Sequence, residues 1–176
     1  MPFPRLFHVS ETASIQRFDP RPPPSPDSGV NGGAVWAIEE ALLHNYLLPR
    51  DCPRVTYCAS AATSDEDRRK FFNTPGCFPV VAIESGWWAR AATTILYLYE
   101  LPLASFTLLD ACAGYWISRV SVEPLRIERI DNPIAVLLAR KVELRPLPEL
   151  WSLRDAVAQS TLQFSIIRMK NARPRA

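Results

Sequence analysis

Proline is unusually frequent in this 176-residue chain, and it limits the length of every helix and strand that the chain can form. The sequence holds 17 prolines against only six glycines. A proline cannot donate a backbone hydrogen bond to a sheet, and inside a helix it removes one hydrogen bond and clashes with the preceding turn. We therefore expect short elements joined by stiff connections.

Short β-prone runs follow one another closely through most of the sequence. We predict strands at 6–10, 34–38, 54–59, 79–85, 95–102, 106–110 and 114–130, with helices near 39–48 and 64–72. The run VELRPL (142–147) is either a last strand or an extended connector. This succession, with few helices between the strands, is typical of an α+β fold rather than a doubly wound α/β fold.

The last part of the chain changes to a helical period. Asp131 or Asn132 can cap a short helix that has Pro133 in its first turn. From about Glu149, apolar residues at helical spacing predict an amphipathic C-terminal helix that extends to Phe164. We expect antiparallel or mixed short-stranded sheets that form a split cleft, with these few helices.

The predicted domain organisation is one α+β domain over 1–170, followed by a basic tail at 171–176. Residues 19–33 form a proline-rich loop, which is either an ordered cover over a site or a disordered segment. We interpret the basic tail as a frayed, solvated terminus, although such a tail can contact phosphates.

Composition narrows the classes of protein. The formal net charge is only +2, and no apolar run approaches the length of a membrane span. The first residues lack the apolar core of a signal peptide, so we expect a cytoplasmic protein. Four cysteines without CxxC spacing and two histidines indicate neither a zinc ribbon nor a metal site. The common glycine-rich nucleotide motifs and the GxSxG hydrolase motif are also absent from the sequence.

One of the two histidines lies in the short run LFHVSE (6–11), which we interpret as a strand. Alternation along a strand places Phe7 and Val9 on one face and Leu6, His8 and Ser10 on the other, with His8 beside Ser10. We expect the apolar pair to enter the core. Two roles stay open for His8: a structural histidine bonded to a backbone carbonyl, or a group that binds a ligand, since imidazole can donate or accept near neutral pH.

Several pieces of sequence carry a resemblance to known proteins: LFHVSE, VWAIEEALLHNY (35–46), YLYELP (97–102) and AGYWISRVSVEPL (113–125). In this order they are similar to the ADP-ribosyltransferase-like fold, which includes rifampicin ADP-ribosyltransferases and the catalytic domain of poly-ADP-ribose polymerases. The whole chain also resembles a bacterial family known only as a domain of unknown function. The first resemblance implies that NAD binds in a split cleft between two small antiparallel sheets.

The same resemblance implies roles for individual residues. His8 matches a first-strand histidine that binds a ribose hydroxyl, while Trp36 and Tyr46 match aromatic residues on either side of the nicotinamide. Ser10 and Tyr115 would also line the cleft. Core packing is the alternative role for the two aromatics of the second strand and following helix.

The implied chemistry is loss of nicotinamide through an oxocarbenium-like transition state, which a nearby acid stabilises. At the position of that acid the chain has Ala113, Gly114 and Tyr115. Asp110, a few residues upstream, is our candidate catalytic acid, and capping of the following turn is its alternative role.

Two arginines are candidates for binding a phosphate or pyrophosphate, because guanidinium groups bind such anions in a bidentate way. Arg21 lies at the start of the proline-rich loop, and a surface salt bridge is its alternative role. Arg50 precedes the DCP run (51–53), where a solvated strand edge is the alternative.

These observations lead to two hypotheses. In the first, a cleft binds a nucleotide or NAD-like ligand, with ADP-ribosyl transfer or NAD glycohydrolysis as the reaction, NAD as substrate and no required cofactor. In the second, the protein is catalytically inactive and binds partners, or a second copy of itself, through exposed aromatics. A membrane or nucleic-acid partner is not expected, and RNA contact through Arg119, Arg126 and the basic tail is a third and weaker option that predicts strong salt dependence.

Overall fold

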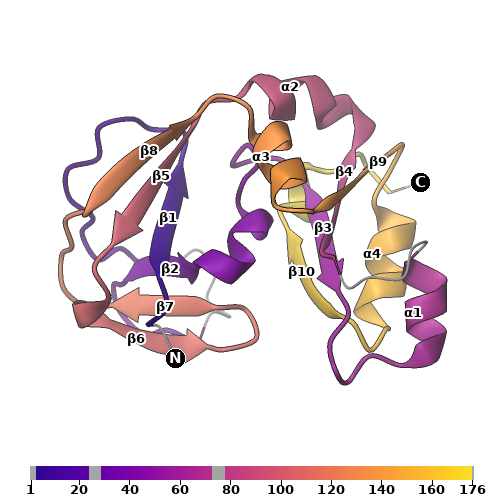
Figure 1. Cartoon of the computed structure of the whole chain (residues 1–176), viewed down its shortest axis with the longest axis horizontal. Coiled ribbons are helices and arrows are strands. Elements are labelled where there is room, and N and C mark those ends of the chain that lie inside the picture. The colour runs from indigo at the N-terminus through magenta and orange to yellow at the C-terminus, as the bar shows by residue number, and fades with distance from the viewer. Residues whose placement is uncertain (1–2, 24–28, 73–77, 176) are drawn as a thin grey trace. The chain divides into compact units, whose positions relative to one another are not determined.

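The computed structural model describes residues 3–23, 29–72 and 78–175, and the chain groups into two compact units. Unit 1 consists of Met1–Leu43 and Ile95–Ile130, and unit 2 of His44–Thr94 and Asp131–Ala176. Each unit contains one β-sheet (Figure 1). Short antiparallel or mixed sheets with a few helices confirm the predicted α+β class, whereas a single domain over 1–170 stays a prediction.

Unit 1 is built on a six-stranded sheet in the order β6-β7-β2-β1-β5-β8, in which all neighbours are antiparallel. Its strands are β1 (Leu6–Ser10), β2 (Val35–Glu39), β5 (Leu96–Leu101), β6 (Phe106–Asp110), β7 (Tyr115–Ser118) and β8 (Arg126–Ile130). The 3₁₀ helix η4 (Leu103–Ser105) joins β5 to β6. The predicted helix at 39–48 is shorter than expected, because β2 includes Glu39 and only η2 (Glu40–Asn45), a 3₁₀ helix, follows it.

The main core of unit 1 lies on one face of this sheet. Its buried members are Leu6, Phe18, Val35, Ala37, Tyr99, Leu101, Phe106 and Val122. Phe18 and Val122 come from outside the strands and pair with each other through two backbone hydrogen bonds of 2.8 and 2.9 Å. The segment before Phe18 is held by the Tyr99 hydroxyl, which donates to the Thr12 carbonyl at 2.7 Å and accepts from the Ile15 amide at 3.1 Å.

The prediction that His8 faces away from the core is wrong. His8 lies opposite Tyr99 in the β1–β5 register, so it shares a face with Leu6 and with the main core. Phe7 is buried on the other face. Alternation correctly places His8 and Phe7 on opposite faces of β1, but it does not indicate that other residues cover both faces.

Unit 2 contains a four-stranded mixed sheet in the order β10-β3-β4-β9, in which only the β4–β9 pair is parallel. Its strands are β3 (Arg54–Cys58), β4 (Val80–Glu84), β9 (Glu143–Leu147) and β10 (Gln163–Ile167). Its helices are α1 (Asp65–Phe71), η3 (Ser85–Trp87), α2 (Trp88–Thr93), α3 (Pro133–Ala139), α4 (Trp151–Ala158) and η5 (Met169–Asn171). VELRPL therefore forms a strand.

The core of unit 2 packs one face of this sheet against α1 and α4. Its buried members are Val55, Tyr57, Phe71, Val80, Ala82, Leu150, Val157 and Leu162. The helix ends follow their sequence signals: the Ser64 hydroxyl caps α1 by accepting from the Asp67 amide at 3.2 Å, and Asn132, rather than Asp131, caps α3.

The prediction of a C-terminal helix through Phe164 is wrong beyond Ala158. The Ser160 hydroxyl donates to the Val157 carbonyl at 2.7 Å and accepts from the Leu162 amide at 3.2 Å, so it ends α4 and starts a turn. Phe164 then lies in β10. The run FSII that follows the turn is β-prone, which outweighs the continuing helical spacing of its apolar residues.

The prediction of a frayed C-terminal tail is also wrong for the described residues. The Arg173 amide donates to Glu84 at 2.9 Å, and the Arg173 carbonyl accepts from the Trp151 indole at 2.7 Å. Arg175 pairs with Asp155 and lies 5.7 Å from the Trp151 ring centroid. A sequence cannot indicate that a terminal segment finds these partners, because all of them lie far away along the chain.

Both ends of the proline-rich loop at 19–33 are ordered, and its middle, 24–28, lies outside the described residues. The backbone of Arg21 exchanges two hydrogen bonds with Ala34, at 2.9 and 3.1 Å. The Arg119 guanidinium donates to the carbonyls of Asn31 and Gly33 at 2.6 and 3.0 Å. Glycine suits position 33 because a Cβ atom there would lie only 3.2 Å from the backbone of Pro20, a tight contact.

An ion pair between β5 and the residue before β1 predicts a pH effect on stability. Arg5 donates to both Glu100 oxygens, at 3.0 and 2.9 Å, and this hydrogen bonding, followed by the charges of Arg5 and Arg126, lowers the pKa of Glu100. The stabilisation is therefore complete above the unfolded-state pKa of about 4.3 and is lost as pH falls through the lower folded value. In urea titrations, Glu100→Gln should cost no more than about 1 kcal/mol at neutral pH and flatten the acid loss of stability. An unchanged acid limb would contradict this assignment.

Candidate functional site

The inner strands β1 and β2 separate partway along their length. β1 pairs with β5 at all five positions from Leu6 to Ser10, but it pairs with β2 only at Leu6↔Glu39 and Phe7↔Ile38. β2 continues alongside β7 as far as Val35. From His8 onward the two central strands are therefore no longer joined by a backbone ladder.

His8 lies at the point where these strands separate. Its Nδ1 is 3.2 Å from the Trp36 carbonyl oxygen, and since a carbonyl can only accept, Nδ1–H is the donor. The His8 ring also lies 4.8 Å from the Phe18 ring, tilted by 51°. The side chain thus supplies the hydrogen bond that the missing ladder would have made, which matches the structural role left open above. In the neutral ring, Nε2 then carries the lone pair.

Trp36 and Tyr115 form the aromatic part of the site. Their ring centroids are 5.8 Å apart and their planes are at 86°, an edge-to-face contact. The Trp36 indole nitrogen is buried and has no hydrogen-bond partner among the residues that the structure describes. A buried donor without an acceptor is energetically unfavourable, which makes this nitrogen a natural contact for a ligand oxygen or a water molecule.

The alternation of β1 and β2 divides the predicted site between two faces. His8 and Ser10 lie on the core face, whereas Trp36 and Tyr115 lie on the other face of the same sheet. The Ser10 hydroxyl accepts from the Thr12 amide at 3.0 Å. The structure therefore brings His8 next to the backbone of Trp36, but it does not collect all four side chains on one surface.

Asp110, the candidate acid, is at the end of β6, where it caps a turn. Its Oδ1 accepts from the amides of Cys112 and Ala113 at 2.8 and 3.0 Å. The turn closes at Gly114, which has a φ of +64° and whose carbonyl accepts from the Glu39 amide at 3.1 Å. This geometry corresponds to the alternative role predicted for Asp110.

Glu39 is a carboxylate that sequence reasoning assigned only to a helix start. In the structure it ends β2 on the same face as His8, two positions along the sheet. Its Oε1 accepts from the Trp116 indole at 2.7 Å. The alternation of VWAIE could have placed Glu39 on this face, but its acidic neighbour Glu40 made a helix N-terminus the simpler interpretation.

The remaining candidates lie away from this point or in the other unit. Arg21 is exposed, with its backbone paired to Ala34. Tyr46 and Arg50 belong to unit 2, where the Arg54 guanidinium lies 5.9 Å from the Tyr46 ring centroid. Arg50 is exposed, and its carbonyl accepts from Arg168 at 3.3 Å.

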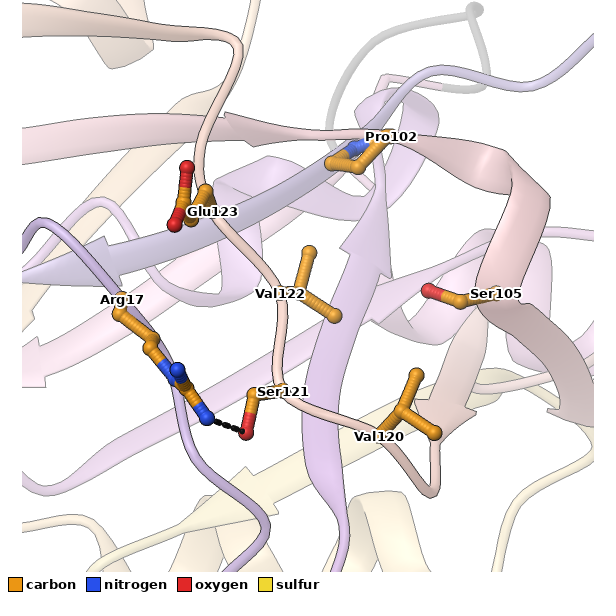
Figure 2. A pocket seen from close by; sticks show the side chains of 7 residues that line it. All are labelled: Arg17, Pro102, Ser105, Val120, Ser121, Val122 and Glu123. Carbon is orange, nitrogen blue, oxygen red and sulfur yellow. Dashed lines mark hydrogen bonds between the residues drawn. The ribbon is translucent and has the colours of Figure 1, made fainter.

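Unit 1 also has an open hollow of about 440 Å³ beside the Phe18–Val122 bridge (Figure 2). It is lined by Arg17, Pro102, Ser105, Val120, Ser121, Val122 and Glu123. Arg17 donates to Ser121 at 2.9 Å and to Asp19 at 2.8 Å, and Ser121 donates to Asp19 at 2.6 Å. The Ser121 and Arg17 hydrogen bonds lower the pKa of Asp19. The side chains of Arg17, Asp19 and Ser121 therefore already satisfy one another's hydrogen bonds on the solvent-facing side of the bridge.

Thiol and metal chemistry have little support in the described part of the chain. No cluster of three or more His, Cys, Asp or Glu side chains there could hold a metal ion. Burial raises the pKa of Cys52 to about 12, so its thiol does not ionise near neutral pH. Cys112 is exposed, and Cys77 lies outside the described residues. Among the described helices, none is long and apolar enough to cross a bilayer.

Comparison with known proteins gives one match. The model of a family of unknown function, DUF6886, matches residues 7–172. No curated protein and no solved structure matches the chain.

Proposed function

Because the chain belongs to the DUF6886 family, whose function is unknown, we propose a function from the site alone: unit 1 binds a nucleotide or NAD-like ligand where β1 and β2 separate. The observation that carries this proposal is the two-position β1–β2 pairing, with the His8 ring in place of the next ladder hydrogen bond. A side chain that substitutes for a ladder bond can exchange that bond for one to a ligand, whereas a backbone pair in mid-sheet cannot.

The groups at this point suit a ligand with a planar ring and hydroxyl groups. Trp36 and Tyr115 are half-buried aromatics on the opposite face of the sheet from His8. A ligand whose ring carbonyl or carboxamide accepts from the Trp36 indole would therefore extend between the separated strands to reach His8. His8 can bind a ribose hydroxyl, as the ADP-ribosyltransferase resemblance implies. If the ligand is NAD and the protein is an enzyme, the reaction is ADP-ribosyl transfer or NAD glycohydrolysis.

Within that proposal Glu39 is a better candidate acid than Asp110. Asp110 uses one oxygen to cap its turn, and Glu39 shares the face of His8. Trp116 positions the Glu39 carboxylate through a single hydrogen bond, so it remains available to a second donor such as a ribose hydroxyl.

The test is calorimetric titration of NAD and ADP-ribose into wild-type protein and three variants, with nicotinamide release followed on the same samples. We expect His8→Ala and Trp36→Leu each to weaken binding about tenfold or more, since each loses one ligand hydrogen bond. His8→Asn, which keeps a donor toward the Trp36 carbonyl, separates loss of fold from loss of ligand contact. Folded wild-type protein that binds neither ligand at millimolar concentration would end this proposal.

An interaction protein is the second candidate, and the outer strand β6 favours it. β6 is an outer strand of its sheet and exposes Leu108, at 48% of its surface, next to Leu109. Exposed apolar residues on a sheet edge can pair with another chain. If ligand binding fails while the protein sediments as a dimer, this candidate replaces the first.

A further inference from the structure

Positive charge is concentrated in unit 2. By residue counts, unit 2 holds 14 Lys and Arg against 9 Asp and Glu, a net of +5, whereas unit 1 holds 6 against 9, a net of −3. The overall charge of +2 therefore hides two units of opposite sign. A basic unit attracts polyanions. Because the two units carry charges of opposite sign, the net charge of unit 2 describes this attraction better than the net charge of the whole chain.

Within unit 2, the C-terminal segment 168–175 is the densest source of this charge, and we call it the basic strap. It contains Arg168, Lys170, Arg173 and Arg175 and no acidic residue. Lys170 and Arg173 are exposed, and neither forms an ion pair with a carboxylate in the described part of the chain. Arg175, by contrast, is neutralised by Asp155.

The backbone of the basic strap is fixed at several points, which distinguishes it from a flexible tail. The Asn171 side-chain amide donates to the Asp51 carbonyl at 2.8 Å, and the backbone of Arg173 is held by Glu84 and Trp151. Arg168 adopts a left-handed conformation with φ of 58°, which is unfavourable for a residue with a side chain. Strain of this kind persists where the surrounding contacts require a particular geometry.

An exposed aromatic lies in the strand that precedes the strap. Phe164, in β10, is 44% exposed, and β10 runs directly into Arg168. β10 is also an outer strand of its sheet. Exposed aromatic rings and exposed cations are together the groups by which proteins bind single-stranded nucleic acids, with bases stacked on the rings and phosphates on the cations.

We propose that the basic strap, together with Phe164, binds single-stranded nucleic acid through its phosphates. Lys170 and Arg173 contact two phosphates, and Phe164 stacks on a base. This binding surface is independent of the ligand site in unit 1. It predicts little sequence preference, because neither contact reads a base edge.

The test is fluorescence anisotropy of a short, labelled, single-stranded RNA of mixed sequence, titrated with the full chain between about 50 and 200 mM salt. We expect the double variant Lys170→Gln/Arg173→Gln to weaken binding about tenfold at the lower salt and to reduce the salt slope by about 1.4, since each phosphate contact on a single strand contributes about 0.7. Phe164→Leu should weaken binding about fivefold with an unchanged salt slope.

The matched control is Arg69→Gln/Lys70→Gln, which removes two exposed cations from α1 and should leave both affinity and salt slope unchanged. If the control weakens binding as much as the strap variant, the attraction is general and the proposal is overturned. It is also overturned if wild-type protein does not bind the RNA, or if polyglutamate or anionic vesicles compete as well as unlabelled RNA. Circular dichroism of each variant shows whether its fold is intact.

Discussion

Arg54→Ala should lower the free energy of unfolding by about 3–5 kcal/mol, because it removes the buried donor group that organises the entrance to β3. The Arg54 side chain is only 2% exposed. Its Nε donates to the Asn45 carbonyl at 2.9 Å, and its Nη1 donates to those of Pro49 and Cys52 at 3.1 and 2.9 Å. Without the guanidinium, the Asn45 and Cys52 carbonyls would lose this donor, whereas the Pro49 carbonyl would keep its bond from the Cys52 amide at 3.0 Å.

The sequence around Arg54 explains why a side chain donates to these backbone carbonyls. Pro49 and Pro53 have no amide hydrogen, so the segment between η2 and β3 has few backbone donors for its carbonyls, although the Cys52 amide donates to the Pro49 carbonyl at 3.0 Å. The planar guanidinium presents several donors in fixed directions, which a lysine does not. We therefore expect Arg54→Lys to recover less than half of the loss.

The measurement is urea unfolding followed by circular dichroism, with thermal unfolding as a second probe. A loss of this size should lower Tm by roughly 10 °C in a chain of this length. Arg69→Ala, an exposed arginine on α1, is the control and should change stability by less than about 0.5 kcal/mol. If Arg54→Ala stays within about 1 kcal/mol of wild type, water or a rearranged backbone satisfies the carbonyls and Arg54 is not the organiser.

Local chemistry explains which parts of this fold could be predicted. The strands β1, β5 and β6 follow alternation and β-propensity, and the caps at Ser64 and Asn132 follow from hydrogen bonds made within one helical turn. Each of these signals is confined to neighbouring residues. For that reason the α+β class and most element positions can be derived from the sequence.

The features that failed depend on distant partners. Which face of β1 enters the main core depends on Phe18 and Val122, which lie outside the strands and belong to the core on that face. The order of the basic strap depends on Glu84 and Trp151. The end of α4 is an exception, because it depends on the local Ser160 hydroxyl, which competes with the helix. The Glu39–Trp116 contact is likewise a product of strand pairing, so no spacing along the chain reveals it.

The second large effect concerns the carboxylate of Glu84 and the backbone of Arg173. Glu84 is 3% exposed, and its Oε1 accepts from the Arg173 amide. Arg173→Pro removes this donor, because proline has no amide hydrogen, but it leaves the C-terminal segment in place. Ala172 has φ of −68° and ψ of 159°, the extended conformation that a residue before proline prefers, so the substitution introduces little strain in the preceding residue.

We expect Arg173→Pro to cost about 2–4 kcal/mol, since it leaves a buried carboxylate without its donor, whereas Arg173→Ala should cost less than about 0.5 kcal/mol because it keeps the amide. Urea unfolding of both variants, alone and combined with Glu84→Gln, measures the coupling. If the donor acts on the charge of Glu84, the proline substitution should cost less in the Glu84→Gln background. If Arg173→Pro costs the same in both backgrounds, or if proline and alanine have equal effects, other contacts hold the strap. The fixed backbone geometry used to argue for nucleic-acid binding would then lose its main support.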